Sequence, residues 1–127
     1  MALDGITTHA RLRKEKGEWL NKKRIVQGIK DGLIIITPAE NGMMAFCHIE
    51  LKIAAIADRN ITFIKTFSEA GKYFRLIEKV QRMIEFKKYS KKILEREILY
   101  TMDDGTKAYL NKKETRIRRI YPRIQSD

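Results

Sequence analysis

The sequence predicts an α+β fold, and the order of its segments is the reason. Strand-like segments come first, one helix-like stretch follows near the middle, and further strand-like segments come after it. Strands grouped in runs, without a helix between each pair, favour an antiparallel sheet over a parallel one. We therefore expect an antiparallel sheet or small barrel packed by one long amphipathic helix over about residues 68–86, with a C-terminal hairpin.

Size and composition predict a single domain over residues 1–127. A chain of 127 residues with 43% hydrophobic and 34% charged residues can bury a core and is too apolar to remain disordered. Its one cysteine, Cys47, excludes an intramolecular disulfide, and its apolar runs are too short to cross a bilayer. We expect a cytoplasmic protein without a transmembrane segment, and the oligomeric state stays open.

The first strands are expected around a turn at Asp31-Gly32. Residues 8–30 fit either a basic helix or two strands. Asp-Gly between two apolar segments is a common hairpin turn. Residues 24–30 and 33–37 are therefore expected to pair as strands across it.

Two more strands are expected before the helix. In residues 43–53 the side chains alternate, which places Cys47 on one face and both Glu50 and Lys52 on the other. A turn after this strand leads into residues 61–67, which have the β-branched and aromatic content of a strand.

The helix is the clearest element of the sequence. Ser68 is a good N-cap for it. Its apolar residues recur at helical spacing and are Ala70, Tyr73, Phe74, Ile77, Val80 and Ile84. Beyond Phe86 the pattern fits either a helix that continues to about Arg96 or a break near Lys87.

The last part of the chain predicts short strands. Residues 97–102 and 106–110 flank an Asp-Asp-Gly turn at 103–105, which predicts a hairpin. Residues 115–121 have the pattern of a last strand, ended by Pro122.

One stretch is similar to a known family. ITFIKTFSEAGKYFRLIEKVQRMI, at residues 61–84, follows GLIIIT at 32–37 and HIELKI at 48–53. Over about residues 24–86 this order resembles the last strands and final helix of pleckstrin-homology or GRAM-type domains. The resemblance implies a binding scaffold, such as an adaptor for a protein or an anionic lipid, and it names no ligand.

The charge of the chain predicts a polyanionic partner. The net charge is +11, and it is concentrated at the two ends of the sequence. Residues 1–24 carry seven basic and three acidic side chains, residues 25–71 carry four and five, and residues 72–127 carry sixteen and eight. Such a field attracts nucleic acid, anionic lipid or an acidic protein surface.

Two basic clusters with interspersed tyrosines are the candidate contact residues. The C-terminal cluster consists of Lys112, Lys113, Arg116, Arg118, Arg119, Tyr121 and Arg123. The helix cluster consists of Arg82, Lys87, Lys88, Tyr89, Lys91, Lys92 and Arg96. Lys and Arg neutralise phosphates and Tyr stacks on exposed bases. These clusters predict a non-enzymatic module that binds DNA or RNA, mainly by contacts to the nucleic-acid backbone and without a cofactor. The alternative is that the clusters are only a solvent-exposed charged surface with no binding role.

A nuclease is the enzymatic alternative. Asp31, Glu50 and Lys52 are similar in order to the motif of PD-(D/E)xK-type nucleases, in which two carboxylates hold Mg²⁺ and a lysine assists the nucleophile. The proline expected before the aspartate is replaced by Lys30. As purely structural residues, the three are a turn residue and the solvent-facing side of a strand.

Overall fold

The computed structural model describes residues 20–68 and 71–123. The helices in these ranges are α2 (Lys22–Asp31) and α3 (Gly71–Glu85), with a short 3₁₀ helix η1 (Glu40–Gly42). The first four strands are β1 (Ile34–Pro38), β2 (Met44–His48), β3 (Ile53–Ala57) and β4 (Ile64–Ser68). The last four are β5 (Tyr89–Ile93), β6 (Glu97–Met102), β7 (Lys107–Asn111) and β8 (Ile117–Tyr121).

All eight strands belong to one sheet, in the order β4-β3-β2-β1-β8-β7-β6-β5. Each group of four strands is an antiparallel meander, and the meanders meet where β1 and β8 run parallel with Ile36 opposite Arg119. The α+β class is confirmed. The sheet is mixed and open, however, because β4 and β5 are separate edges that do not pair to close a barrel.

Helix α2 replaces one of the expected strands. Residues 24–30 were expected to form a strand paired with residues 33–37. Instead, all of residues 24–30 lie within α2, which ends at Asp31. Asn21 caps its start by accepting a hydrogen bond from the Arg24 backbone at 2.9 Å. Gly32, at φ 75°, ends it in the left-handed conformation, so the Asp-Gly pair here terminates a helix and makes no hairpin. The part of the 8–30 question that concerns residues 8–19 lies outside the described residues.

A turn divides the strand that was expected over residues 43–53. β2 ends at His48, and β3 begins at Ile53. The Nδ1 atom of His48 accepts hydrogen bonds from the backbone N–H groups of Glu50 and Leu51, at 3.3 and 3.1 Å. Lys52 has φ 57°, which no strand residue adopts. Local hydrogen bonds to His48 therefore take the place of ladder hydrogen bonds in this segment.

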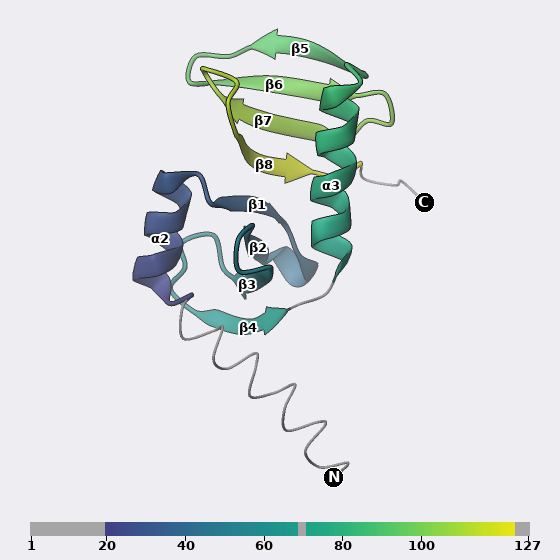
Figure 1. The fold of residues 1–127 in the computed structure, drawn as a ribbon. Coiled ribbons are helices and arrows are strands. Elements are labelled where there is room, and N and C mark those ends of the chain that lie inside the picture. Colours follow the sequence, from purple (N-terminus) through teal and green to yellow (C-terminus); the bar gives the residue numbers. More distant parts are fainter. Residues whose placement is uncertain (1–19, 69–70, 124–127) are drawn as a thin grey trace.

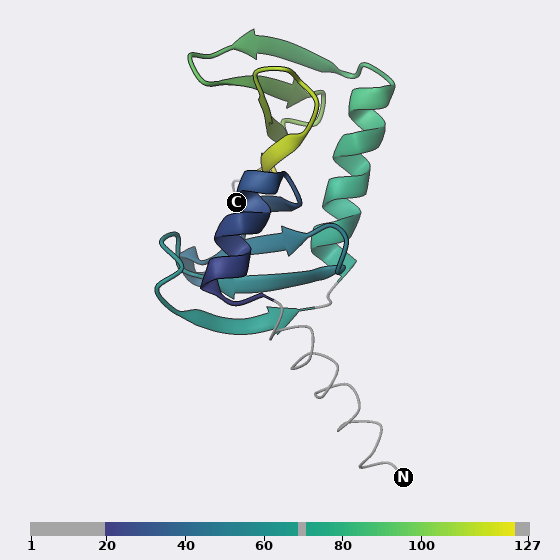
Figure 2. The same cartoon turned by 60° about the vertical axis from the view of Figure 1, so that its left-hand side comes forward.

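Helix α3 packs on both meanders, and α2 packs mainly on the first (Figures 1 and 2). The core under α3 combines Tyr73, Ile77 and Val80 with residues of six strands. These strand residues are Ile35, Ala45, Cys47, Ala54, Ile56, Ile98, Tyr100, Met102, Ala108, Leu110 and Ile120. On the opposite side of the sheet, α2 covers residues of β1 to β3. Neither helix is long and apolar enough to cross a membrane.

The chain around α3 differs from expectation at both ends. Ser68, expected to cap the helix, is the last residue of β4. At the other end, Lys87 takes φ 57° and its N–H bonds the Ile84 carbonyl at 3.0 Å, so the helix stops near the expected break. The next segment is the edge strand β5 and not a continuation of the helix.

The β6–β7 turn is tied to α3 through Asp104. Lys79 of α3 donates to the Asp104 carboxylate, which also accepts from the Thr106 backbone N–H at 2.9 Å. The hydrogen bond from Lys79, followed in importance by those of Thr106, lowers the pKa of Asp104 from 3.8 to about 2, against the opposing effect of burial. The ionised carboxylate is therefore the form that the folded state favours.

We expect Asp104 to contribute to acid stability. Its lowered pKa means that the contribution is complete above about pH 4 and is lost as the pH falls toward 2. Asp104→Asn should lower the free energy of unfolding at pH 7 by roughly 1 kcal/mol, discounted for partial exposure, and flatten its dependence on pH between 4 and 2. Urea titrations at several pH values measure this. Asp103→Asn, one residue away and exposed, is the control; equal effects of both changes would contradict the assignment.

Candidate nucleic-acid interface

One face of the second meander is open. Along β6 and β7, the residues that point to α3 are buried, whereas those between them point to the other side and retain solvent contact. Helix α2 packs on the first meander, and no other element of residues 20–68 and 71–123 buries this surface. We call it the open face. Its side chains are Ser90, Lys92, Glu97, Leu99, Thr101, Lys107, Tyr109, Asn111, Arg118, Arg119 and Tyr121.

Two tyrosines and an arginine pack together on the open face. Tyr109 and Tyr121 lie on adjacent strands and meet edge to face, with ring centroids 5.7 Å apart. The Arg119 guanidinium lies 4.3 Å from the centroid of the Tyr109 ring and donates to the Tyr121 hydroxyl at 3.2 Å. Glu97 accepts a further hydrogen bond from Arg119. Burial alone would lower the pKa of Arg119, but the hydrogen bonds to Glu97 and Tyr121 raise it, so this cation is held in place and stays charged.

A pocket of about 430 Å³ opens beside this cluster, where the β6–β7 turn meets the end of β8. Its lining consists of Gly105, Lys107, Tyr109, Arg119, Tyr121, Pro122 and Arg123. Lys107 and Arg123 are exposed, and neither has a hydrogen-bond or ion-pair partner in the described part of the chain. The pocket thus combines aromatic surface with two cations whose charges are free to meet an anion.

Tyr121, Arg119 and Arg123 are the members of the predicted C-terminal cluster that the structure brings to this pocket. The register shift between β7 and β8 places Arg118 as an extra residue beside Arg119. Arg118 therefore also faces Glu97, at 3.8 Å. A bulge, which a strict alternation of side chains does not predict, is the reason that these two neighbouring arginines share one face.

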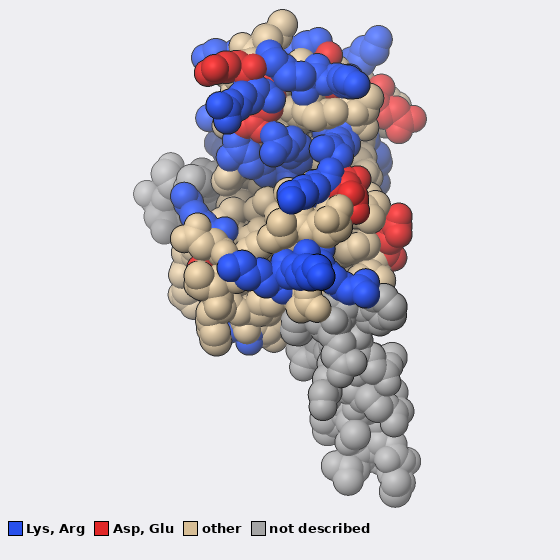
Figure 3. Space-filling view, turned by 90° about the vertical axis from the view of Figure 1, so that its left-hand side faces the viewer, with Lys and Arg blue, Asp and Glu red and all other residues tan. Residues whose placement is uncertain are grey.

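The other members of the C-terminal cluster lie at one end of the strands. Lys112 and Lys113 are in the β7–β8 turn, and Arg116 donates to the Lys30 carbonyl at 3.1 Å. Figure 3 looks onto this end of the molecule and shows Lys and Arg gathered over its upper part, with a second row lower down. The basic surface therefore extends beyond the open face.

The helix cluster is divided by the strand that replaces the helix. Lys87 and Lys88 lie in the turn before β5, whereas Lys91 and Lys92 point to opposite sides of β5. Lys91 pairs with Glu114 on the side of α3, and Lys92 lies on the open face. Tyr89 is stacked on the buried Tyr100, with centroids 4.0 Å apart, which leaves one side of its ring covered. Only Lys92 of this cluster joins the open face, among the residues that the structure describes.

The three residues of the nuclease alternative are not gathered into one site. Glu50 and Lys52 were expected on one strand face, but both lie in the β2–β3 turn. Asp31 and Glu50 line one hollow of about 270 Å³ beside α2, whereas Lys52 extends toward α3, with its Nζ 5.9 Å from the Phe74 ring centroid. The Asp31 carboxylate accepts a hydrogen bond from the side-chain amide of Gln27, in the same helix, at 2.9 Å. Residues 20–68 and 71–123 contain no group of three or more His, Cys, Asp or Glu side chains that could hold a metal ion.

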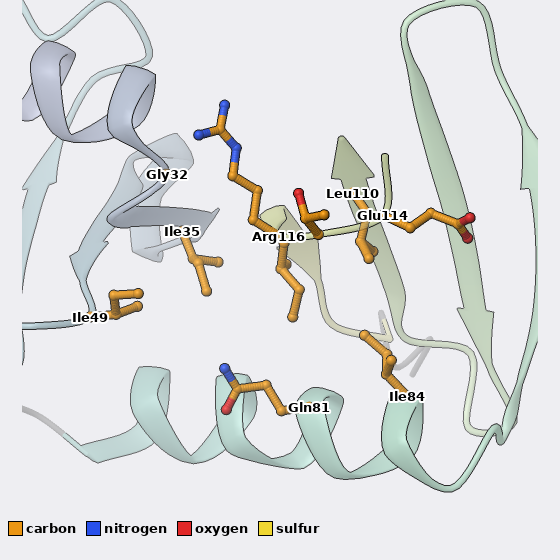
Figure 4. A pocket seen from close by; sticks show the side chains of 10 residues that line it. Gly32, Ile35, Ile49, Gln81, Ile84, Leu110, Glu114 and Arg116 are labelled. Atoms are coloured by element: carbon orange, nitrogen blue, oxygen red, sulfur yellow. The ribbon is translucent and has the colours of Figure 1, made fainter. Parts of the chain in front are cut away.

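Another cavity, of about 310 Å³, lies between α3 and the sheet (Figure 4). Apolar side chains of both meanders and of α3, including Ile35, Ile84 and Leu110, form much of its lining. Its two charged residues turn away from it, because Arg116 reaches toward α2 and Glu114 reaches toward Lys91. The cavity therefore offers little beyond apolar contact.

The charged and aromatic residues of the open face that were not among the sequence candidates are Lys107, Tyr109 and Glu97. A sequence signal for the first two exists, because they alternate with Ala108 and Leu110 in the expected strand over residues 106–110. Nothing in the sequence indicates that Glu97 faces Arg119, which is 22 residues away and two strands across the sheet.

Comparison with models of protein families, with curated proteins and with solved structures finds no match for this chain.

Proposed function

We propose that this protein is a non-enzymatic module that binds nucleic acid through the open face and the basic end of its second meander. The observation that carries the proposal is that Lys107 and Arg123, which have no partner in the described ranges, lie beside tyrosines on a sheet face that no described element covers. Exposed Lys and Arg beside accessible aromatic rings are the combination that proteins use to follow a phosphate backbone and contact its bases.

Electrostatics supplies most of the affinity in this proposal. Lys92, Lys107, Arg118 and Arg123 surround the Tyr109–Arg119 pair, and Glu97 is the acidic neighbour. Lys113 and Arg116 continue the positive surface around the end of the strands. Binding through such contacts releases counterions, so affinity falls steeply with salt and needs no Mg²⁺.

A gain of affinity tests where the interface lies. Glu97→Gln removes the negative charge of the open face, so the affinity for an oligonucleotide should rise at low salt by up to roughly five-fold, or about 1 kcal/mol. The amide oxygen of the introduced glutamine can still accept a hydrogen bond from Arg119 and keep the guanidinium oriented, but Arg119 loses its charged partner, so the melting temperature should fall. Fluorescence anisotropy and thermal melting measure the two effects.

Glu78→Gln is the matched control, since Glu78 is an exposed residue of α3 and makes the same change of charge away from the open face. An equal rise for both variants would indicate a general charge effect and contradict the proposed interface. Binding to vesicles of anionic lipid but to no nucleic acid would favour an adaptor, as the pleckstrin-homology resemblance implies. Cleavage that needs Mg²⁺ and is lost in Glu50→Ala would favour the nuclease.

A further inference from the structure

We infer that the nucleic acid is single-stranded and that the pocket beside Tyr109 receives one unstacked base. This inference rests on the proposed function and adds to it the form of the ligand and the place of one base. The pocket is an open hollow of about 430 Å³. That volume lies within the range of small-molecule sites in proteins, about 300–1,000 Å³.

The walls of the pocket supply flat surfaces for a base. Tyr109 and Tyr121 stand nearly at right angles, with an interplanar angle of 88°. The Arg119 guanidinium lies over Tyr109 and is itself a planar cation on which bases stack. A base that enters therefore meets a π surface made of the Tyr121 ring, the guanidinium and the part of the Tyr109 ring that the guanidinium leaves uncovered.

This surface is formed before any ligand binds. Glu97 and the Tyr121 hydroxyl both accept hydrogen bonds from Arg119, so its guanidinium is fixed in orientation. Binding then orders few additional side chains, and the entropy that ordering would cost is saved. Lys107 and Arg123, which have no partner among residues 20–68 and 71–123, line the same pocket, where they can hold the phosphates on either side of the base.

The shape of the interface favours a single strand over a duplex. Bases in a duplex are stacked on both sides and reach a protein only through their edges in the grooves. Reading those edges needs an element that protrudes into a groove, whereas the rings of Tyr109 and Tyr121 lie in a hollow of the sheet and are half-buried. An unstacked base of a single strand can enter such a hollow.

The test compares three ligands of equal length, roughly 12 nucleotides, within the range bound by single-strand modules. They are an oligo-dT strand, a chain of abasic sites with the same phosphates, and a duplex, each measured by anisotropy at one salt concentration. We expect oligo-dT to bind at least roughly five-fold more tightly than either of the others, since a base stacked on an aromatic ring adds affinity that phosphate contacts alone do not supply.

Two substitutions assign that difference to the pocket. Tyr109→Leu should remove the preference for oligo-dT over the abasic chain, and Tyr109→Phe should keep it, because the ring is retained. Phe63→Leu is the control, since Phe63 is an exposed aromatic residue of the first meander. Thermal melting checks each fold, and the comparison of ligands on the unaltered protein needs no variant.

The outcomes separate the inference from the proposed function. Equal affinity for oligo-dT, the abasic chain and the duplex would overturn the inference and leave backbone binding in place. A preference that survives Tyr109→Leu in a folded variant would overturn the assignment to this pocket. Binding to none of the three ligands, even at low salt, would overturn the proposed function as well.

Discussion

Replacing both Lys107 and Arg123 with alanine is expected to weaken binding of a single-stranded oligonucleotide by up to roughly thirty-fold at low salt. Both side chains line the pocket of the open face, and neither has a partner in the described ranges that would have to be broken before it meets a phosphate. An exposed ion pair contributes up to about 1 kcal/mol, and two such contacts give this loss.

The dependence on salt identifies the cause of that loss. Each phosphate contact with a single strand contributes about 0.7 to the slope of log affinity against log salt concentration. The double variant should therefore have a slope smaller by about 1.4, measured by anisotropy titrations at several NaCl concentrations. Lys65→Ala, in β4 at the opposite edge of the sheet, removes one positive charge as a control. An unchanged slope in the double variant would place the phosphates elsewhere.

Ile77→Ala is expected to lower the free energy of unfolding by about 2–5 kcal/mol. Ile77 is 3% exposed and packs in the core that α3 shares with both meanders. Its truncation leaves a cavity that well-packed neighbours fill only in part. The core under α3 contains residues of both meanders, so Ile77 lies where the two meanders share buried surface.

The same variant tests whether the two meanders fold as one unit. Because they share the core under α3, we expect one unfolding transition, seen at the same urea concentration by circular dichroism and by tyrosine fluorescence. Glu78→Ala, an exposed change on the same helix, should alter stability by less than about 0.5 kcal/mol. Two separate transitions, or hydrogen exchange that opens the second meander alone, would show that it is an independent unit.

Local signals in the sequence are enough to determine some of the turns and strand ends. Asp103-Asp104-Gly105 turns the chain between β6 and β7, because glycine at φ 91° fits a turn that other residues adopt with strain. β8 ends before Pro122 for a similarly local reason, since proline cannot donate to a ladder. The class, α+β, follows from such signals taken together.

Other segments had two acceptable local structures, and packing chose between them. Residues 24–30 suit a strand by composition, yet they form part of α2 because a helix there buries Ile25 and Gly28 against the first meander. Glu50 and Lys52 alternate as strand residues do, but hydrogen bonds to His48 turn the chain before they reach a strand. The nuclease alternative depended on that alternation, so the turn separates its residues.

The sequence by itself determined the charge, the α+β class and which side chains are basic. Which of these residues share a surface was decided by the tertiary structure. Arg119 and Glu97 are in contact because their strands, β8 and β6, are separated by β7 alone and both side chains lie on the same face. Lys107 and Arg123 line one pocket because the β6–β7 turn lies beside the end of β8. The sequence does not reveal these contacts because the side chains on one face of the sheet come from strands that are distant in the sequence. Their pairing, and the bulge that aligns Arg118 with Arg119, exist only in the assembled sheet.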